Sequence, residues 1–291
     1  MRVLLCGSTG MLGQAIVKKF SKSDVELYTL ARKNADINMD LLDEENLKEV
    51  LNKLEPDLII NAAAIVNLQF CEKNPADAYM LNARPVAVFA NYVRLNNKYL
   101  VQISTDHYYP DRENILHDES SQVSLLNEYA KTKFAGECFA LTAENSLVIR
   151  TNIVGFRGIE TRPTFIEWAL NSLKNKEDMQ LFDNVYSSSI AVSQLSHILY
   201  DLVTRNAKGI FNIASRESVS KKDFIMSLAR KFEISSQYTR VVSYLPEDLL
   251  QRSTSMGLNV MKAEHFLGYL MPDMEQVVDQ LYSDYLEVEH S

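Results

Sequence analysis

Residues 6–13 of the chain read "CGSTGMLG", with Gly7, Gly10 and Gly13 three residues apart. The loop follows an apolar segment, "RVLLC", that predicts a buried strand, and a helical pattern begins at Met11. A glycine-rich turn in this context is typical of dinucleotide-binding domains, where backbone N–H groups and the helix N-terminus bind a pyrophosphate. The alternative is a turn without a ligand, but three of the nine glycines lie in this loop. The residues expected to contact the dinucleotide are Gly7, Thr9, Gly10, Met11, Leu12 and Gly13.

Strand and helix patterns alternate through the first half of the chain. Further apolar runs of strand length occur at residues 25–31, 57–64, 99–105 and 146–154. Helical patterns lie between them at residues 43–54, 75–97 and 128–143, and Pro85 is expected to interrupt or kink the second. This alternation predicts an α/β fold with a doubly wound parallel sheet of the Rossmann type.

The alternation weakens after residue 155, where a strand at 209–215 lies among helical patterns at 165–176, 220–232 and 273–287. No Gly-, Ser- or Pro-rich linker separates the two halves. We therefore expect a smaller, mixed C-terminal lobe that binds substrate. The expected domains are 1–155, with a returning segment near 186–215, and 156–291.

Composition and charge exclude several classes of protein. The formal net charge of −8 argues against nucleic-acid binding, which needs a basic face. Three widely spaced cysteines form no C-x-x-C motif and no disulfide framework, which favours a reducing cytoplasm. The five histidines show no metal-ligand spacing, so we expect no metal. The sequence shows no signal peptide and no apolar run long enough to span a bilayer, so we expect no membrane partner.

The segment after the second predicted strand reads "LARKN" and carries Arg32 where an NAD site usually has an acidic residue. A guanidinium suits the 2′-phosphate of NADP, so we expect NADPH as cofactor, with NAD as the alternative. A solvated basic turn would look the same. Asp40 and Leu41 are candidates to flank the adenine, although Asp40 could instead cap the next helix.

The polar stretch "NEYAKTKFAGE" at residues 127–137 places Tyr129 and Lys133 one helical turn apart. About one Tyr-x-x-x-Lys pair is expected by chance in this composition, so a plain surface helix is the alternative. A free tyrosine keeps its proton up to about pH 10, and a nearby ammonium would stabilise the phenolate. Tyr129 could therefore donate a proton to a carbonyl oxygen as hydride reaches the carbon.

Five segments occur in order along the chain: "GSTGMLG", "NAAAIV", "STDHYYP", "NEYAKTKFAGE" and "LVIRTNIVG". Together they resemble the extended short-chain dehydrogenase/reductases, and within them the dTDP-4-dehydrorhamnose reductase branch. That branch reduces a keto group on nucleotide-linked sugars. The resemblance is good over about residues 1–215 and looser beyond. It implies a catalytic set of Thr105, Tyr129 and Lys133.

Thr105 ends a predicted strand, where α/β sheets place their ligand crevice. Ser104 is the alternative hydroxyl, since alternation allows only one of the two side chains to face the site, and both could simply belong to a strand-end turn. By resemblance, Asn82 helps to orient the lysine, although a plain polar helix residue is the alternative. The cofactor is also expected to contact Asn61, Ala62, Ala63, Ala64, Asn82, Tyr129 and Lys133.

The sequence departs from the reductase branch in three places. His107 stands where that branch has Tyr, Ile153 where it has Trp, and Ser253 where it has Pro. The reductase machinery is thus present while the sugar pocket differs. Arg252 is a candidate for the substrate diphosphate, because a fork of donors matches phosphate oxygens, with an ordinary surface arginine as the alternative. The expected substrate-binding residues are Ser104, Asp106, His107, Asn152, Ile153 and Arg252.

These features predict an NADPH-dependent oxidoreductase that reduces a keto group, at C4, on a nucleoside-diphosphate 6-deoxy sugar. An epimerase or dehydratase of the same fold is one alternative, for which Asp106 with His107 is a partial match. A non-catalytic NADP-binding regulatory subunit is another, although such relatives often lose part of the catalytic set. The oligomeric state is open, with a homodimer among the candidates.

Overall fold

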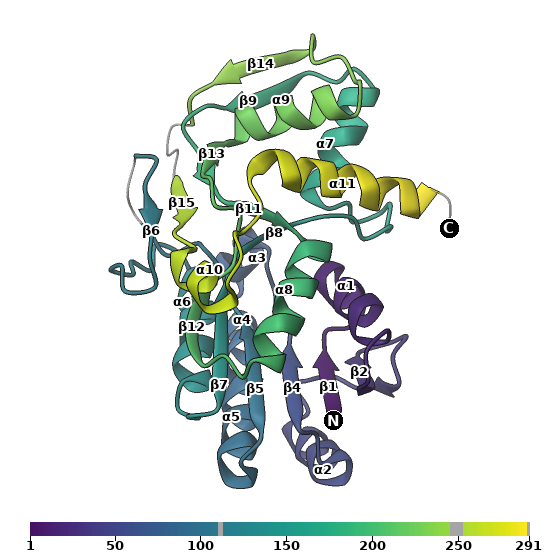
Figure 1. Ribbon diagram of the computed structural model, residues 1–291, viewed down its shortest axis with the longest axis vertical. Coiled ribbons are helices and arrows are strands. Elements are labelled where there is room, and N and C mark those ends of the chain that lie inside the picture. The colour runs from purple at the N-terminus through teal and green to yellow at the C-terminus, as the bar shows by residue number, and fades with distance from the viewer. Residues whose placement is uncertain (110–112, 245–252, 290–291) are drawn as a thin grey trace. The chain divides into compact units, whose positions relative to one another are not determined.

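The structure is a computed structural model that describes residues 1–109, 113–244 and 253–289 (Figure 1). Two compact units are formed by interleaved segments of the chain. The first unit comprises Met1–Thr105, Leu125–Arg150 and Ser196–Phe211. The second unit comprises Asp106–Ser124, Thr151–Leu195 and Asn212–Ser291.

The first unit is built on a seven-stranded sheet, and every pairing from β3 through to β7 is parallel. The order reverses between β1 and β4, because the chain adds β2 and β3 on one side before it crosses to the other. Such a switch point is where doubly wound sheets bind ligands. The predicted fold class is confirmed. The strands in spatial order are β12 (Gly209–Asn212), β7 (Ser146–Arg150), β5 (Tyr99–Ile103), β4 (Leu58–Asn61), β1 (Arg2–Cys6), β2 (Glu26–Ala31) and β3 (Ile37–Asn38).

Helices pack on this sheet through a continuous apolar core. Leu4 and Cys6 of β1, Leu100 of β5 and Phe89 of α5 are fully buried in one cluster. Phe20 of α1 meets Tyr200 of α8 edge-to-face with ring centroids 5.3 Å apart, so these two helices are neighbours. The helices of the first unit are α1 (Met11–Phe20), α2 (Glu44–Leu54), α3 (Leu68–Lys73), α4 (Pro75–Asn82), α5 (Arg84–Asn96), α6 (Glu128–Ala140) and most of α8 (Val192–Thr204).

The predicted break at Pro85 is confirmed, because α4 ends at Asn82 and α5 begins at Arg84. The prediction of one strand over residues 146–154 is wrong. That segment forms β7 and then β8 (Asn152–Val154), interrupted at Thr151, and the two strands belong to different sheets in different units. Both halves are apolar and β-branched, so composition does not reveal the interruption.

Close approach of α4 and α6 depends on Gly136. A Cβ atom at this position would lie 2.7 Å from the carbonyl oxygen of Asn82, at the end of α4. Real Cβ atoms are essentially never this close to backbone, so a side chain would push the helices apart. Glycine is otherwise unfavourable in a helix interior, by about 1 kcal/mol relative to alanine. Packing therefore explains this residue where helix propensity does not.

In its described residues the second unit has three small sheets, ordered β13-β10-β15-β6, β11-β8 and β14-β9. Its core lies among α7, α9 and α11, where Ile166, Leu228 and Val277 are fully buried. The strands are β6 (Leu116–His117), β8 (Asn152–Val154), β9 (Met179–Phe182), β10 (Tyr186–Ser187), β11 (Ser189–Ala191), β13 (Val219–Ser220), β14 (Thr239–Val242) and β15 (Ser255–Leu258). The helices are α7 (Phe165–Lys174), α9 (Lys221–Lys231), α10 (Met261–Leu267) and α11 (Met274–Glu289).

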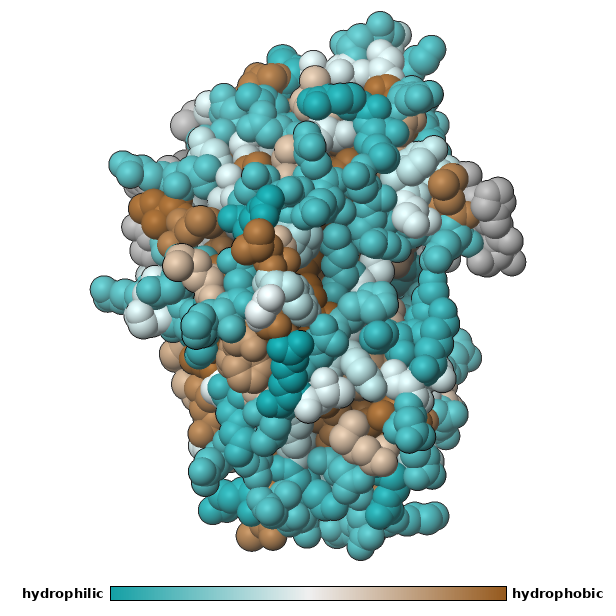
Figure 2. Space-filling view, viewed as in Figure 1, coloured by the Kyte–Doolittle hydropathy of each residue, from teal (hydrophilic) through white to brown (hydrophobic). Residues whose placement is uncertain are grey.

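The surface is mainly hydrophilic on the face shown in Figure 2. Large apolar side chains are exposed on and just after α10, including Met261 at 69% and Leu270 at 67%. Across the described ranges, no helix combines the length and apolar character needed to cross a bilayer.

We predict that Gly136→Ala lowers the free energy of unfolding by about 1–3 kcal/mol, as expected for an overpacked contact against rigid backbone. Urea denaturation followed by circular dichroism measures this change. Helix propensity alone predicts the opposite sign, so a more stable variant would contradict the packing argument.

Candidate functional site

The glycine loop joins β1 to α1 and adopts a backbone that needs two of its three glycines. Gly7 has φ +81°, and a Cβ atom on Gly13 would lie 2.2 Å from the carbonyl oxygen of Gly7. Gly10 is different: its φ of −75° suits any residue, and a Cβ there would meet only the Gly7 oxygen, at 3.3 Å. The fold therefore requires Gly7 and Gly13, while the absence of a side chain at Gly10 leaves space beside the helix N-terminus.

Two further observations fit a bound phosphate. Gly10, the N-cap of α1, has no side chain, so the N-cap supplies no side-chain hydrogen bond to the first-turn N–H groups. The Ser8 hydroxyl is buried and has no hydrogen-bond partner among the described residues. An orphaned hydroxyl in this loop is explained by a ligand that would accept from it. The sequence predictions missed Ser8, although its place between Gly7 and Gly10 was a visible signal.

Arg32 is exposed immediately after β2. The next acidic residue along the chain, Asp36, is already engaged, because its Oδ2 accepts from the N and Oγ1 of Thr29. Asp40 does not cap α2: its Oδ1 accepts from the N of Leu42, and Asp43 is the N-cap. Leu41 is buried.

Lys133 is buried on α6, and its ammonium donates to the carbonyl oxygen of Ile103, at the end of β5, at 2.7 Å. The same oxygen accepts from Nε2 of Gln102 at 2.9 Å. The Oε1 of Gln102 accepts from Nδ2 of Asn61 at 2.8 Å, and Asn61 Oδ1 accepts from the N of Ala63. A continuous buried network thus ties Lys133 to the ends of β4 and β5, beside the switch point.

The charge of Lys133 is costly in this setting. Burial lowers the pKa of its ammonium to about 8, while the negative charge of Glu137, one turn further along α6, acts in the opposite direction. Glu137 is itself held by Arg150 at the end of β7, whose Nε and Nη2 donate to its carboxylate. This buried ion pair fastens α6 to the sheet.

Tyr129 is buried on α6, one turn before Lys133, and Asn127 caps the helix by accepting from the N of Ala130. Thr105 and Ser104 are also buried. The N of Ser104 donates to the carbonyl oxygen of Ile149, which continues the hydrogen bonding between β5 and β7 by one residue. The three residues of the predicted catalytic set all belong to the first unit.

Asn82 makes contacts other than one to the lysine. Its Oδ1 accepts from the N of Ile65, and its Nδ2 donates to the Ile65 oxygen and to Oγ1 of Thr132. Asn82 thus joins the segment after β4, which begins with Ala62, Ala63 and Ala64, to the residue preceding Lys133 on α6. Its predicted role in orienting the lysine can act only through this helix.

The predicted substrate residues Asp106, His107, Asn152 and Ile153 belong to the second unit. Asp106 is buried, and its Oδ2 accepts from Nδ2 of Asn152 at 2.6 Å. The Nε2 of His107 lies 3.9 Å from Asp106 Oδ1. Ile153 pairs with Ile190 between β8 and β11. Arg252 lies outside the described residues, and no group of His, Cys, Asp or Glu within those ranges could hold a metal ion.

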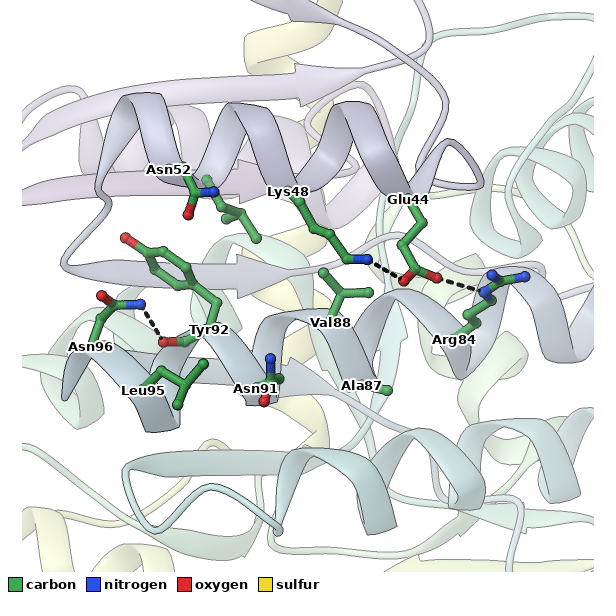
Figure 3. Close-up of a pocket in the computed structure, with 11 residues that line it drawn as sticks. Glu44, Lys48, Asn52, Arg84, Ala87, Val88, Asn91, Tyr92, Leu95 and Asn96 are labelled. Atoms are coloured by element: carbon green, nitrogen blue, oxygen red, sulfur yellow. Dashed lines mark hydrogen bonds and ion pairs between the residues drawn. The ribbon is translucent and has the colours of Figure 1, made fainter.

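A groove of about 460 Å³ lies between α2 and α5 and shares no residue with the predicted site (Figure 3). Glu44 sits in it between two cations, accepting from Nζ of Lys48 at 2.8 Å and from Nε of Arg84 at 2.9 Å. Val88, Tyr92 and Leu95 supply apolar walls. The Glu44 carboxylate is thus paired with both cations of the groove wall.

Comparison with known proteins agrees with this arrangement. Residues 1–287 match the family described as the RmlD substrate binding domain. The chain belongs to this family. The dTDP-4-dehydrorhamnose reductase of Salmonella typhimurium is 25% identical over 297 residues, with 98% of each chain covered. Methionine adenosyltransferase 2 subunit beta of Rattus norvegicus is 26% identical over 276 residues, covering 90% of this chain and 81% of that protein.

Among solved structures, dTDP-4-dehydrorhamnose reductase from Bacillus anthracis in complex with NADP has a TM-score of 0.87. The two sequences are 22% identical, and the structural alignment covers 97% of this chain and 98% of the Bacillus anthracis chain. The resemblance to the dTDP-4-dehydrorhamnose reductase branch, inferred from the ordered motifs, is confirmed by the match to the RmlD family.

We predict that Gly10→Val folds but binds neither NADPH nor NADH measurably. The side chain would occupy the space where the loop approaches a pyrophosphate, while the backbone at this position already has a φ open to valine. Fluorescence titration measures cofactor binding, and thermal unfolding checks the fold. Binding as tight as that of the parent would refute the assignment of this loop.

We predict that Lys133 loses its proton near pH 8 in the unliganded protein. Lys131 is the matched control: it lies on the same helix, and its hydrogen bond to Glu128 raises its pKa above the usual value. Carbon-13 NMR of the lysine side chains, assigned with Lys133→Arg, follows both groups. An ordinary pKa near 10.5 for Lys133 would show that its ammonium is not desolvated.

Proposed function

We propose that this protein is a reductase that uses NADPH to reduce the C4 keto group of a nucleoside-diphosphate 6-deoxy sugar. The observation that carries the proposal is the buried ammonium of Lys133, fixed to the Ile103 carbonyl one helical turn after Tyr129. A surface helix, the alternative for this motif, would leave both side chains in water. Both are at least nine-tenths buried.

The residues that would hold the cofactor are those of the glycine loop with Ser8, Arg32 immediately after β2, and Lys133. Arg32 favours NADPH, because an exposed guanidinium matches a 2′-phosphate and Asp36 is engaged by Thr29. The Bacillus anthracis relative carries NADP in its structure, which supports the same choice. When bound, the nicotinamide would supply the hydride.

Tyr129 is the proposed general acid, which protonates the carbonyl oxygen of the substrate. Lys133 stabilises the phenolate that Tyr129 leaves behind, because its ammonium lies on the same helix. The Ile103 carbonyl fixes the ammonium and limits where it can move. Thr105 is the proposed second donor to the same substrate oxygen.

The sugar is proposed to be recognised by the second unit, through Asp106, His107 and Asn152. Ser253, where the reductase branch has Pro, is buried and donates its hydroxyl proton to the carbonyl oxygen of Tyr109. It therefore serves the fold of the second unit. The changes at His107 and Ile153 are what support a sugar pocket that differs from that of the dehydrorhamnose reductases.

We predict that Tyr129→Phe retains cofactor binding and lowers turnover by about 10²–10⁴-fold, since only the transferable proton is removed. The measurement is NADPH absorbance with a panel of dTDP-, UDP-, GDP- and CDP-linked 4-keto sugars. Tyr238→Phe, an exposed tyrosine of the second unit, is the control and should keep full activity.

Turnover that survives unchanged in Tyr129→Phe would contradict the mechanism. Failure of the parent protein to oxidise NADPH with any sugar, alongside tight cofactor binding and a stable protein partner, would instead favour a regulatory subunit. The relative named as subunit beta of an adenosyltransferase makes that outcome a specific one to test.

A further inference from the structure

A chain of hydrogen bonds crosses the second unit from Lys221 to Asp106. The Nζ of Lys221, in the first turn of α9, donates to Oγ of Ser187 at 3.0 Å. The hydroxyls of Ser187 and Ser189 lie 3.3 Å apart, and Ser189 donates to Oδ1 of Asn152 at 2.9 Å. Nδ2 of Asn152 then donates to Oδ2 of Asp106 at 2.6 Å. None of the predictions from sequence included Lys221 or the two serines.

The two ends of the chain fix the direction of every proton in it. Lys221 can only donate, and an ionised Asp106 can only accept. Ser187 accepts from Lys221, and the proton of Ser189 is committed to Asn152, so the proton of Ser187 must point at Ser189. Bonds aligned in this way strengthen one another, most of all between opposite charges in a buried setting.

Burial and packing hold the chain in place. Ser187, Ser189 and Asp106 are each at most 4% exposed. The ring of Phe165 lies 5.1 Å from the Nζ of Lys221 and covers the ammonium on one side. Burial lowers the pKa of Lys221, whereas the negative charge of Asp106 raises it, so the two ends of the chain interact electrostatically.

These hydrogen bonds fix the side-chain amide of Asn152, which could otherwise exchange the positions of its oxygen and nitrogen. Its Oδ1 is occupied by Ser189 and one hydrogen of Nδ2 by Asp106. Within the described residues the second hydrogen of Nδ2 has no acceptor, and the side chain is partly exposed. The amide is therefore presented to a ligand as a donor and not as an acceptor.

We propose that Lys221 is a positioning residue: through Ser187 and Ser189 it fixes the amide of Asn152, so that the remaining N–H binds an oxygen of the sugar nucleotide. The inference rests on the proposed function for the identity of the ligand. The chain of hydrogen bonds from Lys221 to Asp106 is a property of the protein alone, and it can be tested without a substrate.

The kinetic test compares Lys221→Met, Lys221→Arg and Lys222→Met. Lys221→Met should raise KM for the sugar nucleotide about tenfold, the loss expected for one charge-assisted hydrogen bond, with kcat and the KM for NADPH within about twofold. Lys221→Arg keeps the charge and the donors and should recover most of the loss. Lys222→Met, whose ammonium pairs with exposed Asp223, is the matched control and should behave as the parent.

A second kinetic measurement tests whether Lys221 acts through the chain. Ser187→Ala interrupts the chain while leaving Lys221 in place, so it should raise KM as Lys221→Met does. The double variant should be no worse than either single one. Additive effects, or a loss in Lys221→Met that Lys221→Arg does not rescue, would overturn the proposal.

The substrate-free measurement is the pKa of Lys221 by carbon-13 NMR of the unliganded protein. Asp106→Asn removes the charge that raises this pKa, so the value should fall further below that of an ordinary lysine. An unchanged pKa of Lys221 would refute the coupling of Lys221 to Asp106 through these hydrogen bonds, even if no sugar is reduced. A lowered value together with an inactive parent protein would instead refute the proposed function and leave the chain supported.

Discussion

Burying the ammonium of Lys133 is the constraint on which the first unit depends. A desolvated charge persists in a protein only when fixed dipoles replace the lost water. The Ile103 carbonyl supplies that dipole at the end of β5, and it is shared with Gln102, which is tied in turn to Asn61 at the end of β4. Strand β4, one of the two strands at the switch point, and the residue proposed to tune the acid are thus parts of one network.

Helix α6 must lie close to the sheet for this network to form. The Glu137–Arg150 ion pair fastens α6 to β7. In the same turn, Gly136 has no side chain and leaves room for the Asn82 carbonyl at the end of α4, so that α4 packs closely against α6. Gly136 and Glu137 follow Lys133 by three and four residues, on the same side of the helix. One helix surface therefore carries both the packing and the chemistry.

The second unit stabilises a desolvated ammonium, that of Lys221, in another way. Lys221 and Asp106 do not touch, but four aligned hydrogen bonds through two serines and an asparagine connect them. Both units place a lysine at the edge of buried polar side chains. In the first unit the lysine faces a backbone carbonyl, and in the second it sets the direction of side-chain protons. The first arrangement suits a residue that tunes an acid, and the second suits one that orients a donor.

Local sequence patterns were enough to predict β1, the glycine loop, α1, the break at Pro85 and the Tyr129–Lys133 helix, because each depends on residues within one or two turns of one another. The five motifs, taken in their order along the chain, were enough to predict the family. The partner of Lys133 lies 30 residues away and that of Lys221 lies 34 residues away, so no periodicity reveals them. The interruption at Thr151 was likewise invisible, since β7 and β8 both contain β-branched apolar residues, and only their pairing with different strands assigns them to different sheets. Propensity and turn chemistry act along the chain, whereas hydrogen-bond partners and sheet membership depend on which distant segments the fold brings together.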